Sequence, residues 1–251
     1  MKQAKHKARR TRAVREDIRE RLLDAALAEF GAKGFDGAST RSIARRIGAH
    51  QPQINYHFES KEALWTAAVD HLFAALARAM RGLGPARVPR GSGAVTEVTA
   101  TFAEMIRRFV RFAAAHPELN QIMVHEATAQ SDRLAWMAER HVKPLYDTVR
   151  PLWRRLREAG IAAPIDDRLF HYVMVGAASL VYVNAPEVRL LTGIEPTAHR
   201  WVETHADGLV GTLLPNAPRG TMTEGAAAPS RRDRARGKEP TARPKRRARR
   251  P

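Results

Sequence analysis

Amide, hydroxyl and basic side chains gather in residues 39–58, which read S-T-R-S-I-A-R-R-I-G-A-H-Q-P-Q-I-N-Y-H-F. Amide side chains can pair bidentately with adenine, so Gln51, Gln53 and Asn55 are candidates to read base edges. Hydroxyl, cationic and imidazole groups can instead hold phosphates and set register without reading sequence. The candidates for that role are Ser39, Thr40, Arg41, Tyr56, His57 and Lys61. These residue types favour contact with double-stranded DNA, although Tyr56 is equally compatible with packing and a solvated helix face stays an alternative for the amides.

Two short helices joined by a tight turn must position these side chains, over about residues 40–47 and 51–57. Ser39 can cap the first helix and Gly48 can end it. Pro52 is tolerated because it falls in the first turn of the second helix. Small or branched apolar residues would face inward where the helices cross: Ile43, Ala44, Ile47 and Ile54. The pattern predicts a helix-turn-helix whose second helix can lie in the major groove, although many paired helices share it.

The rest of the chain is predicted to be all-α, because apolar residues recur at three- and four-residue steps and sustained alternation is missing. A first helix is expected over residues 16–33, with Gly34 as its left-handed stop and Phe35 packed back on Phe30. Pro144 predicts a kink or a restart inside a later helix. The further helices are expected at about 60–81, 95–115, 118–129, 131–159, 166–184 and 196–214.

The net charge of +17 is concentrated at the two ends of the chain. Residues 1–15 carry seven Lys or Arg and no acid, and residues 216–251 carry twelve Lys or Arg and three acids. Both segments are expected to be disordered, and from about residue 216 onward the chain cannot bury enough apolar surface to offset its ordering entropy. Basic arms of this kind commonly contact nucleic acid, and a solvating or targeting role is the alternative.

Several classes of site and location are disfavoured by composition. The chain has no cysteine, which excludes disulfides, thiolate nucleophiles and Cys-ligated zinc. His125–Glu126 begins like a zinc-protease motif, but Ala129 stands where the second histidine is needed. A metal site from His125, His141 and His171 would rest on spacing across three helices, so no metal and no cofactor are expected. Without a secretory signal or an apolar run of ~18 residues, we expect a cytoplasmic, nucleoid-associated protein without membrane contact.

Two flanking motifs give the helix-turn-helix a specific context: F-x-x-K-G-F at residues 30–35 and I-N-Y-H-F-x-S-K-E-A-L at residues 54–64. With them, residues 16–64 resemble the TetR/AcrR family of bacterial transcriptional repressors. The resemblance is looser over residues 95–214. There H-P-E-L at 116–119 and D-R-L-A-W at 132–136 are similar to the ligand-binding half of some members.

The resemblance implies a three-helix DNA-binding head over residues 16–76 and a larger helical body over residues 77–215 that binds an effector and dimerises. The dimer would form through about residues 166–184 and 196–214. Two positions depart from the common pattern. His50, counted with the candidate DNA contacts, stands where Ser or Thr usually caps the recognition helix, and Asn55 stands where Tyr is common.

A small organic effector would need an apolar pocket with a few polar anchors. The candidate lining residues are Phe102, Met105, Phe109, Met123, Trp136, Met137, His141, Tyr146, His171, Tyr172 and Met174, each of which is also compatible with ordinary core. The leading interpretation is a transcriptional repressor that a small molecule releases from a palindromic operator. The alternatives are a general nucleoid-coating protein and a small helical enzyme. The enzyme is disfavoured because G-x-S-x-G, P-loop and dinucleotide-binding motifs are missing.

Overall fold

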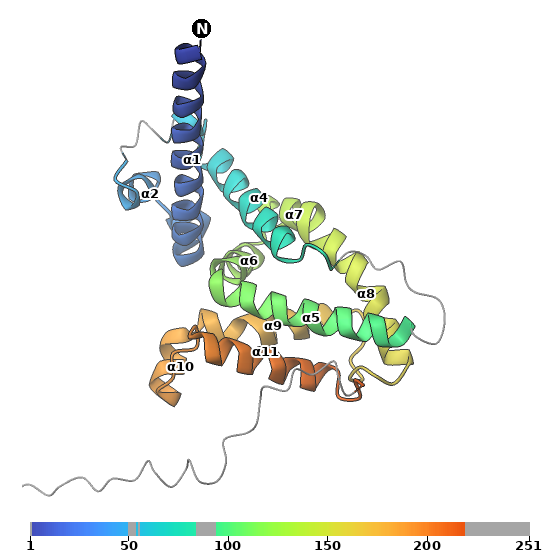
Figure 1. Cartoon of the computed structure of the whole chain (residues 1–251). Helices are drawn as coiled ribbons and strands as arrows, with labels where there is room; N and C mark the ends of the chain where they lie inside the picture. Colours follow the sequence, from blue (N-terminus) through green and yellow to red (C-terminus); the bar gives the residue numbers. More distant parts are fainter. Residues whose placement is uncertain (1, 50–53, 55, 84–93, 219–251) are drawn as a thin grey trace, which may run out of the picture.

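The computed structural model describes residues 2–49, 54, 56–83 and 94–218 (Figure 1). Every regular element in these ranges is helical, which confirms the all-α prediction. In chain order the elements are α1 (Lys2–Gly37), α2 (Thr40–Arg46), α4 (Lys61–Ala79), α5 (Ala94–Ala115), α6 (Glu118–Ala129), α7 (Asp132–Met137), the π-helix η1 (Ala138–Val142), α8 (Lys143–Glu158), α9 (Phe170–Val183), α10 (Ala185–Thr192) and α11 (His199–Leu213).

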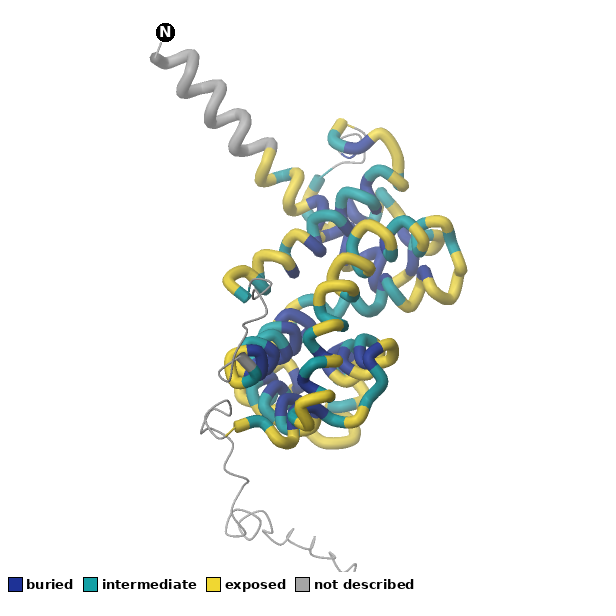
Figure 2. The backbone as a smooth tube through the Cα atoms, turned by 90° about the vertical axis from the view of Figure 1, so that its right-hand side faces the viewer, coloured by how far each residue is buried: buried dark blue, intermediate teal, exposed yellow. Residues whose placement is uncertain are grey.

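The helices form a small N-terminal head and a larger body (Figure 1). In the head, α2 and α4 pack on α1, and in the body α5 packs against both α9 and α11. The two parts meet where α6 packs along α1, and α4 runs from the head to the body. Buried residues line the inner faces of the helices in both parts (Figure 2), so each part has an apolar core.

Helix α1 differs from the prediction at its N-terminal end. It begins at Lys2 rather than near residue 16, so the basic segment continues the helix where a disordered arm was expected. The reason is local: residues 2–15 contain neither Gly nor Pro and are rich in Lys, Arg and Ala, which are strong helix formers. Of the basic tail expected over residues 216–251, only 216–218 fall within the described residues.

The predicted stop at Gly34 is confirmed as a break within α1. Gly34 has φ 69°, in the left-handed region that favours glycine. Beyond it, the ring of Phe35 stacks on that of Phe30, with centroids 6.0 Å apart and planes 8° from parallel. This contact turns the chain toward α2, and so it fixes the entry into the helix-turn-helix.

The interruption predicted at Pro144 is also confirmed. The expected single helix over residues 131–159 is divided into α7, the π-helix η1 and α8, with Pro144 in the first turn of α8. A first-turn proline costs no hydrogen bond, because the first amides of a helix lack intrahelical partners. The π turn just before it supplies the change of direction between the two α-helices.

Helix α10 is an element that the sequence did not predict. The chain leaves α9 at Asn184 and starts a new helix with Pro186 in its first turn. Leu190 and Leu191 on α10 are exposed, so this short helix shows little of the one-sided apolar pattern that would reveal it. Gly193, with φ 69°, ends it.

Candidate nucleic-acid interface and ligand cavity

The N-terminal end of α2 is open to solvent and is shaped as a helix start. Ser39 has an extended backbone, and its Oγ accepts a hydrogen bond from the Ser42 amide at 3.4 Å. Arg41 is exposed next to it, and Thr40 is half-buried. Ser39 therefore acts as the predicted cap, while the first amides of α2 and the Arg41 guanidinium lie where a phosphate could reach them.

Beyond the turn that follows α2, Tyr56 faces solvent. Ile54 and Phe58 are buried in the head, whereas Tyr56 is 63% exposed and its ring meets the His57 ring edge-on at 5.1 Å. This exposure favours a surface role for Tyr56 over the packing alternative. His50, Gln51, Gln53 and Asn55 lie outside the described residues.

Lys61 makes contacts within the protein rather than pointing away from it. Its Nζ donates to the Asp36 carbonyl at 3.3 Å and lies 4.7 Å from the centre of the Phe35 ring. Lys61 therefore ties the first turn of α4 to the segment that enters α2. It was predicted only as a phosphate contact, and this structural role was missed.

A buried carboxylate joins α1 to α2. The side chain of Glu29 is fully buried, and its two oxygens lie 2.7 Å from Lys33 Nζ and 3.2 Å from Arg46 Nη2. Burial raises the pKa of Glu29, but the hydrogen bond and charge of Lys33, together with hydrogen bonds from Ser42 and Ser39, outweigh it, so the pKa lies below its ordinary value. Arg46 is thereby fixed on α2, which sets the orientation of the helix-turn-helix against α1.

The body contains an apolar cavity of about 100 Å³ between α4, α5, α8 and α9. A single water needs only ~10–15 Å³ on this kind of measure, so the space exceeds that of one solvent molecule. The lining residues are Leu76, Met80, Met105, Phe109, Leu145, Tyr146, Val149, Arg150, Asp167, Phe170, His171, Met174 and Val175. Five of the predicted residues are among them: Met105, Phe109, Tyr146, His171 and Met174.

The other six predicted residues do not line the cavity. Phe102 and Met137 are buried in the core, and Met123 packs partly buried against it. Trp136 and His141 lie near α4, where their rings contact Trp65 and Phe73. Tyr172 is 72% exposed on α9. These six residues lie away from this cavity, and residue type alone does not show which face of a helix meets it.

Two polar lining residues were missed, Arg150 and Asp167. Arg150 Nε donates to Asp167 Oδ2 at 2.7 Å, and Arg154 Nη2 donates to the same oxygen at 2.7 Å. The hydrogen bonds from Arg154 and Arg150 hold the pKa of Asp167 well below its usual range. Burial lowers the pKa of His171, which keeps its imidazole neutral near pH 7. The residues from α8 follow a one-sided stripe of apolar and basic positions, the signal that could have identified this wall.

Arg133 on α7 joins the body to the head. Its guanidinium lies 3.8 Å from the centre of the Phe35 ring, and its Nε donates to Glu126 Oε2 at 3.1 Å. Its Nη1 also lies 3.6 Å from Glu62 Oε2 on α4. Ser131 donates a further hydrogen bond to the buried Glu126 carboxylate. Arg133 thus contacts α6, α4 and the end of α1 at once.

Helices α6 and α1 approach closely beside this contact. His125 Nε2 donates to the Gly31 carbonyl at 3.1 Å. A Cβ on Gly31 would lie 2.8 Å from Gln121 Oε1 and 2.9 Å from Glu118 Cβ, so the interface requires glycine. His125 therefore contacts the head, while His141 and His171 lie elsewhere in the body. No group of three metal-ligating side chains forms within the described residues.

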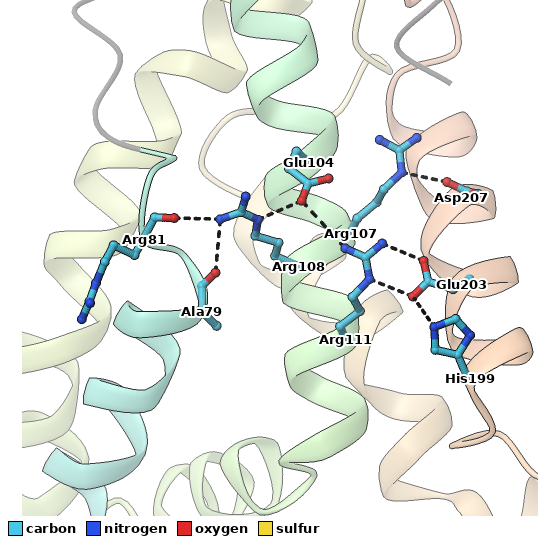
Figure 3. A network of polar contacts seen from close by, with 9 residues as sticks. All are labelled: Ala79, Arg81, Glu104, Arg107, Arg108, Arg111, His199, Glu203 and Asp207. Carbon is cyan, nitrogen blue, oxygen red and sulfur yellow. Dashed lines mark hydrogen bonds and ion pairs between the residues drawn. The ribbon is translucent and has the colours of Figure 1, made fainter. Parts of the chain in front are cut away.

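The far end of α4 is fastened to the body by a network of arginines (Figure 3). Arg108 on α5 donates to the carbonyls of Arg81 at 2.8 Å and Ala79 at 3.5 Å, which satisfies groups left open at the C-terminal end of α4. One helical turn on, Arg111 makes a bidentate pair with Glu203 on α11, at 2.7 Å for both bonds. Helices α4, α5 and α11 are therefore linked through polar contacts.

Comparison with known proteins places this arrangement in a family. The family described as "Bacterial regulatory proteins, tetR family" matches residues 22–68, which span most of the head. The HTH-type transcriptional regulator RutR of Escherichia coli is 28% identical over 186 residues, which cover 74% of this chain and 82% of that protein. The tetracycline repressor protein class D of Escherichia coli is 38% identical over 56 residues, covering 22% and 26% of the two chains.

Solved structures share the fold over the head and the body together. AibR, in a complex with isovaleryl coenzyme A and operator DNA, aligns with a TM-score of 0.58 at 18% identity and covers 78% of this chain and 98% of its own. A TetR-like regulator from Rhodococcus sp. aligns with a TM-score of 0.54 at 19% identity, over 80% and 93%. None of the helices in the described ranges is both long and apolar enough to span a bilayer. Residues 22–68 therefore match the DNA-binding head of the TetR family of bacterial regulatory proteins, and the chain as a whole is similar to regulators of that family in sequence and in its two-part helical fold.

Proposed function

We propose that this protein is a sequence-specific DNA-binding repressor, released from a palindromic operator when a small organic effector occupies the cavity of the body. The observation that carries the proposal is the course of α4. This helix begins at Lys61, directly after the helix-turn-helix, and its other end supplies Leu76 and Met80 to the cavity wall. One rigid element therefore touches both the DNA-reading head and the site where a ligand would bind.

The contacts around α4 support a mechanical connection. Arg108 holds the C-terminal end of α4 against α5, and Arg133 holds its N-terminal end against α7 and Phe35. A ligand that displaces Met80 or Met105 would tilt α4 between these two fixed ends. If the ligand favours the conformation that does not bind DNA by only about 1–3 kcal/mol, DNA binding weakens roughly 5- to 150-fold.

The roles in the head follow from charge and exposure. We assign the first turn of α2 and exposed Tyr56 to phosphate contacts, with Ser39, Thr40, Arg41 and His57 beside them. The amides of Gln51, Gln53 and Asn55 are assigned to base reading, with His50 at the start of that segment. The basic N-terminal part of α1 adds attraction that is independent of sequence.

A homodimer would place two such heads on the two halves of an operator. We assign the dimer contact to the outer faces of α9 and α11, where Gly176, Ala177, Leu180, Thr204 and Gly208 are exposed. Small residues there allow close approach of a second copy. Val202, Leu209 and Leu213 of α11 are buried in the protein's own core, so the opposite face of this helix is the one left for a partner.

The test is selection on random DNA with the purified full-length protein, followed by footprinting of the selected site. A palindromic footprint is expected. The protein would act in the bacterial cytoplasm, bound to DNA at the nucleoid. Uniform coating of all sequences would instead indicate a general nucleic-acid-binding protein. A ligand screen for release from the selected site then tests the effector half of the proposal.

A further inference from the structure

One edge of the cavity has an excess of positive charge. Asp167 accepts hydrogen bonds from Arg150 and Arg154 at 2.7 Å each, and Arg157 Nη2 lies 3.8 Å from its other oxygen. Three guanidinium groups therefore share one carboxylate. Asp166 does not reduce this excess, because it is paired with Arg168 at 2.9 Å.

Arg150 is the arginine of this cluster that lines the cavity. It donates to Asp167 through Nε, and among the described residues its Nη1 and Nη2 form no hydrogen bond. The side chain is 34% exposed, so these two nitrogens are hydrated rather than buried without partners. Because Asp167 fixes the guanidinium plane, the remaining N–H groups are oriented in advance for a planar acceptor.

The remaining wall is apolar, and the cavity reaches the surface beside Arg150. Met105, Phe109 and Met174 line it from α5 and α9. Leu145, which lines it from α8, is 42% exposed and lies about one turn and a half before Arg150 on the same helix. A ligand that fits would therefore place an apolar part inside and a polar end at the α8 edge.

We propose that the cavity binds an apolar chain that ends in a carboxylate, with the chain against Met105 and Phe109 and the carboxylate on Arg150. A cationic end group is disfavoured because Asp167, the one acid of the lining, is already held by three arginines. A neutral end group can accept a hydrogen bond from Arg150 but lacks the negative charge that makes such a bond strong. This inference rests on the proposed function, since it takes the cavity as the effector site.

The test is calorimetric titration of the full-length protein with three eight-carbon probes that differ only in the end group. Octanoate should bind at least about tenfold more tightly than octanamide, since hydrogen bonds to charged groups are the stronger ones. Octylamine should bind more weakly than octanamide. Equal affinity for all three, or a preference for the amine, would overturn the proposal.

Two variants separate the end-group contact from the stability of the cluster. Arg150→Met should remove most of the preference for octanoate over octanamide. Arg154→Met is the matched control: it gives up the same Asp167 partner, but Arg154 does not line the cavity, so the preference should stay within about twofold. An unchanged preference in Arg150→Met, or equal decreases in both variants, would contradict direct contact with Arg150.

Operator binding, measured on the same protein preparation, distinguishes failure of the carboxylate proposal from failure of the proposed repressor function. If octanoate does not bind while a palindromic footprint forms and another compound releases it, only the ligand class is wrong. If no palindromic footprint forms, the repressor assignment fails whichever probe binds. If octanoate binds tightly and the footprint persists, the carboxylate site stands and its regulatory role is overturned.

Discussion

The Arg133 guanidinium lies 3.8 Å from the centre of the Phe35 ring, so a side chain of the body covers a side chain of the DNA-binding head. The same Phe35 ring packs on Phe30 of α1 and lies 4.7 Å from Lys61 Nζ of α4. Cation–π contacts of this type are worth about 0.5–2 kcal/mol, depending on desolvation. The chain entering α2 is therefore held by groups from both parts of the protein.

Replacing Arg133 with Met should destabilise the protein by about 2–4 kcal/mol. The variant leaves the Glu126 carboxylate, whose side chain is 2% exposed, without its cationic partner. Urea unfolding measures the change. The control is Arg140→Met, which removes an exposed pair with Asp70 and should change stability little. Equal stability of Arg133→Met and the native protein would show that the contact is energetically unimportant.

The same variant should weaken the coupling between ligand and operator. With Arg133 and its contacts to Phe35 and Glu62 gone, a movement of the body is transmitted less fully to the head. The ratio of ligand affinities with and without operator DNA should therefore move toward one. An undiminished ratio in a folded Arg133→Met protein would place the coupling in another contact.

Gly208→Arg should convert the dimer to a monomer without unfolding it. A Cβ on Gly208 meets nothing within 4 Å in the isolated chain, so the new side chain clashes only with a partner. Sedimentation should show the loss of the dimer and far-ultraviolet circular dichroism an unchanged helix content. The matched control is Ala127→Arg, also exposed but on α6, which should stay dimeric. A dimeric Gly208→Arg protein would exclude the assigned face.

Deletion of residues 2–12 should weaken binding to every DNA sequence and flatten its salt dependence. The deletion removes six cations, Lys2, Lys5, Lys7, Arg9, Arg10 and Arg12. Every phosphate that these cations no longer neutralise reduces the slope of log affinity against log salt by about 0.9. Gln53→Ala is the contrasting variant: it should relax preference at particular base pairs, by about 1–3 kcal/mol, and keep the salt slope. An unchanged slope after the deletion would show that the segment does not touch DNA.

Stability should fall as the pH drops below about 6.5, in part because of His205. Its Nε2 donates to the Ala177 carbonyl at 3.0 Å, so Nδ1 accepts the hydrogen bond from Tyr182 Oη at 3.0 Å. Burial lowers the pKa of His205 below its usual 6.5, although the bond to Ala177 opposes this. The unfolded chain then binds the proton more readily, so stability is full above the unfolded pKa and declines with acid.

Urea unfolding between pH 5 and 8 measures this dependence. His205→Gln keeps a donor and an acceptor but cannot be protonated, so its stability should vary less with pH than that of the native protein. Burial also lowers the pKa values of His141 and His171, so part of the dependence should survive in the variant. An identical pH profile for the variant and the native protein would contradict the role of His205.

The sequence could predict the helix caps and breaks that depend on interactions between neighbouring residues. The Ser39 cap, the break at Gly34 and the interruption at Pro144 each depend on a few neighbouring residues, and each is confirmed. The start of α1 was placed about fourteen residues too late, although the Lys, Arg and Ala of residues 2–15 favour helix.

The contacts that join distant segments could not be predicted in the same way. Arg133 reaches Phe35 across nearly a hundred residues, and the cavity combines α4 with α8 and α9. Hydrophobic periodicity shows that a helix has a buried face but not which helix covers it. Hence only five of the eleven proposed residues line this cavity, and the polar pair Arg150 and Asp167 was not among those proposed.

Helix α1 is uninterrupted from Lys2 up to the break at Gly34. Helical residues rise about 1.5 Å each, so the stretch from Lys2 to Asp17 extends over roughly 22 Å, comparable to six or seven base pairs at about 3.4 Å each. A helical backbone holds its residues at set distances from the helix-turn-helix, whereas a coil samples many distances. If this segment contacts DNA, the length of DNA engaged beyond each half-site should depend on the number of helical residues and should shorten with every turn removed.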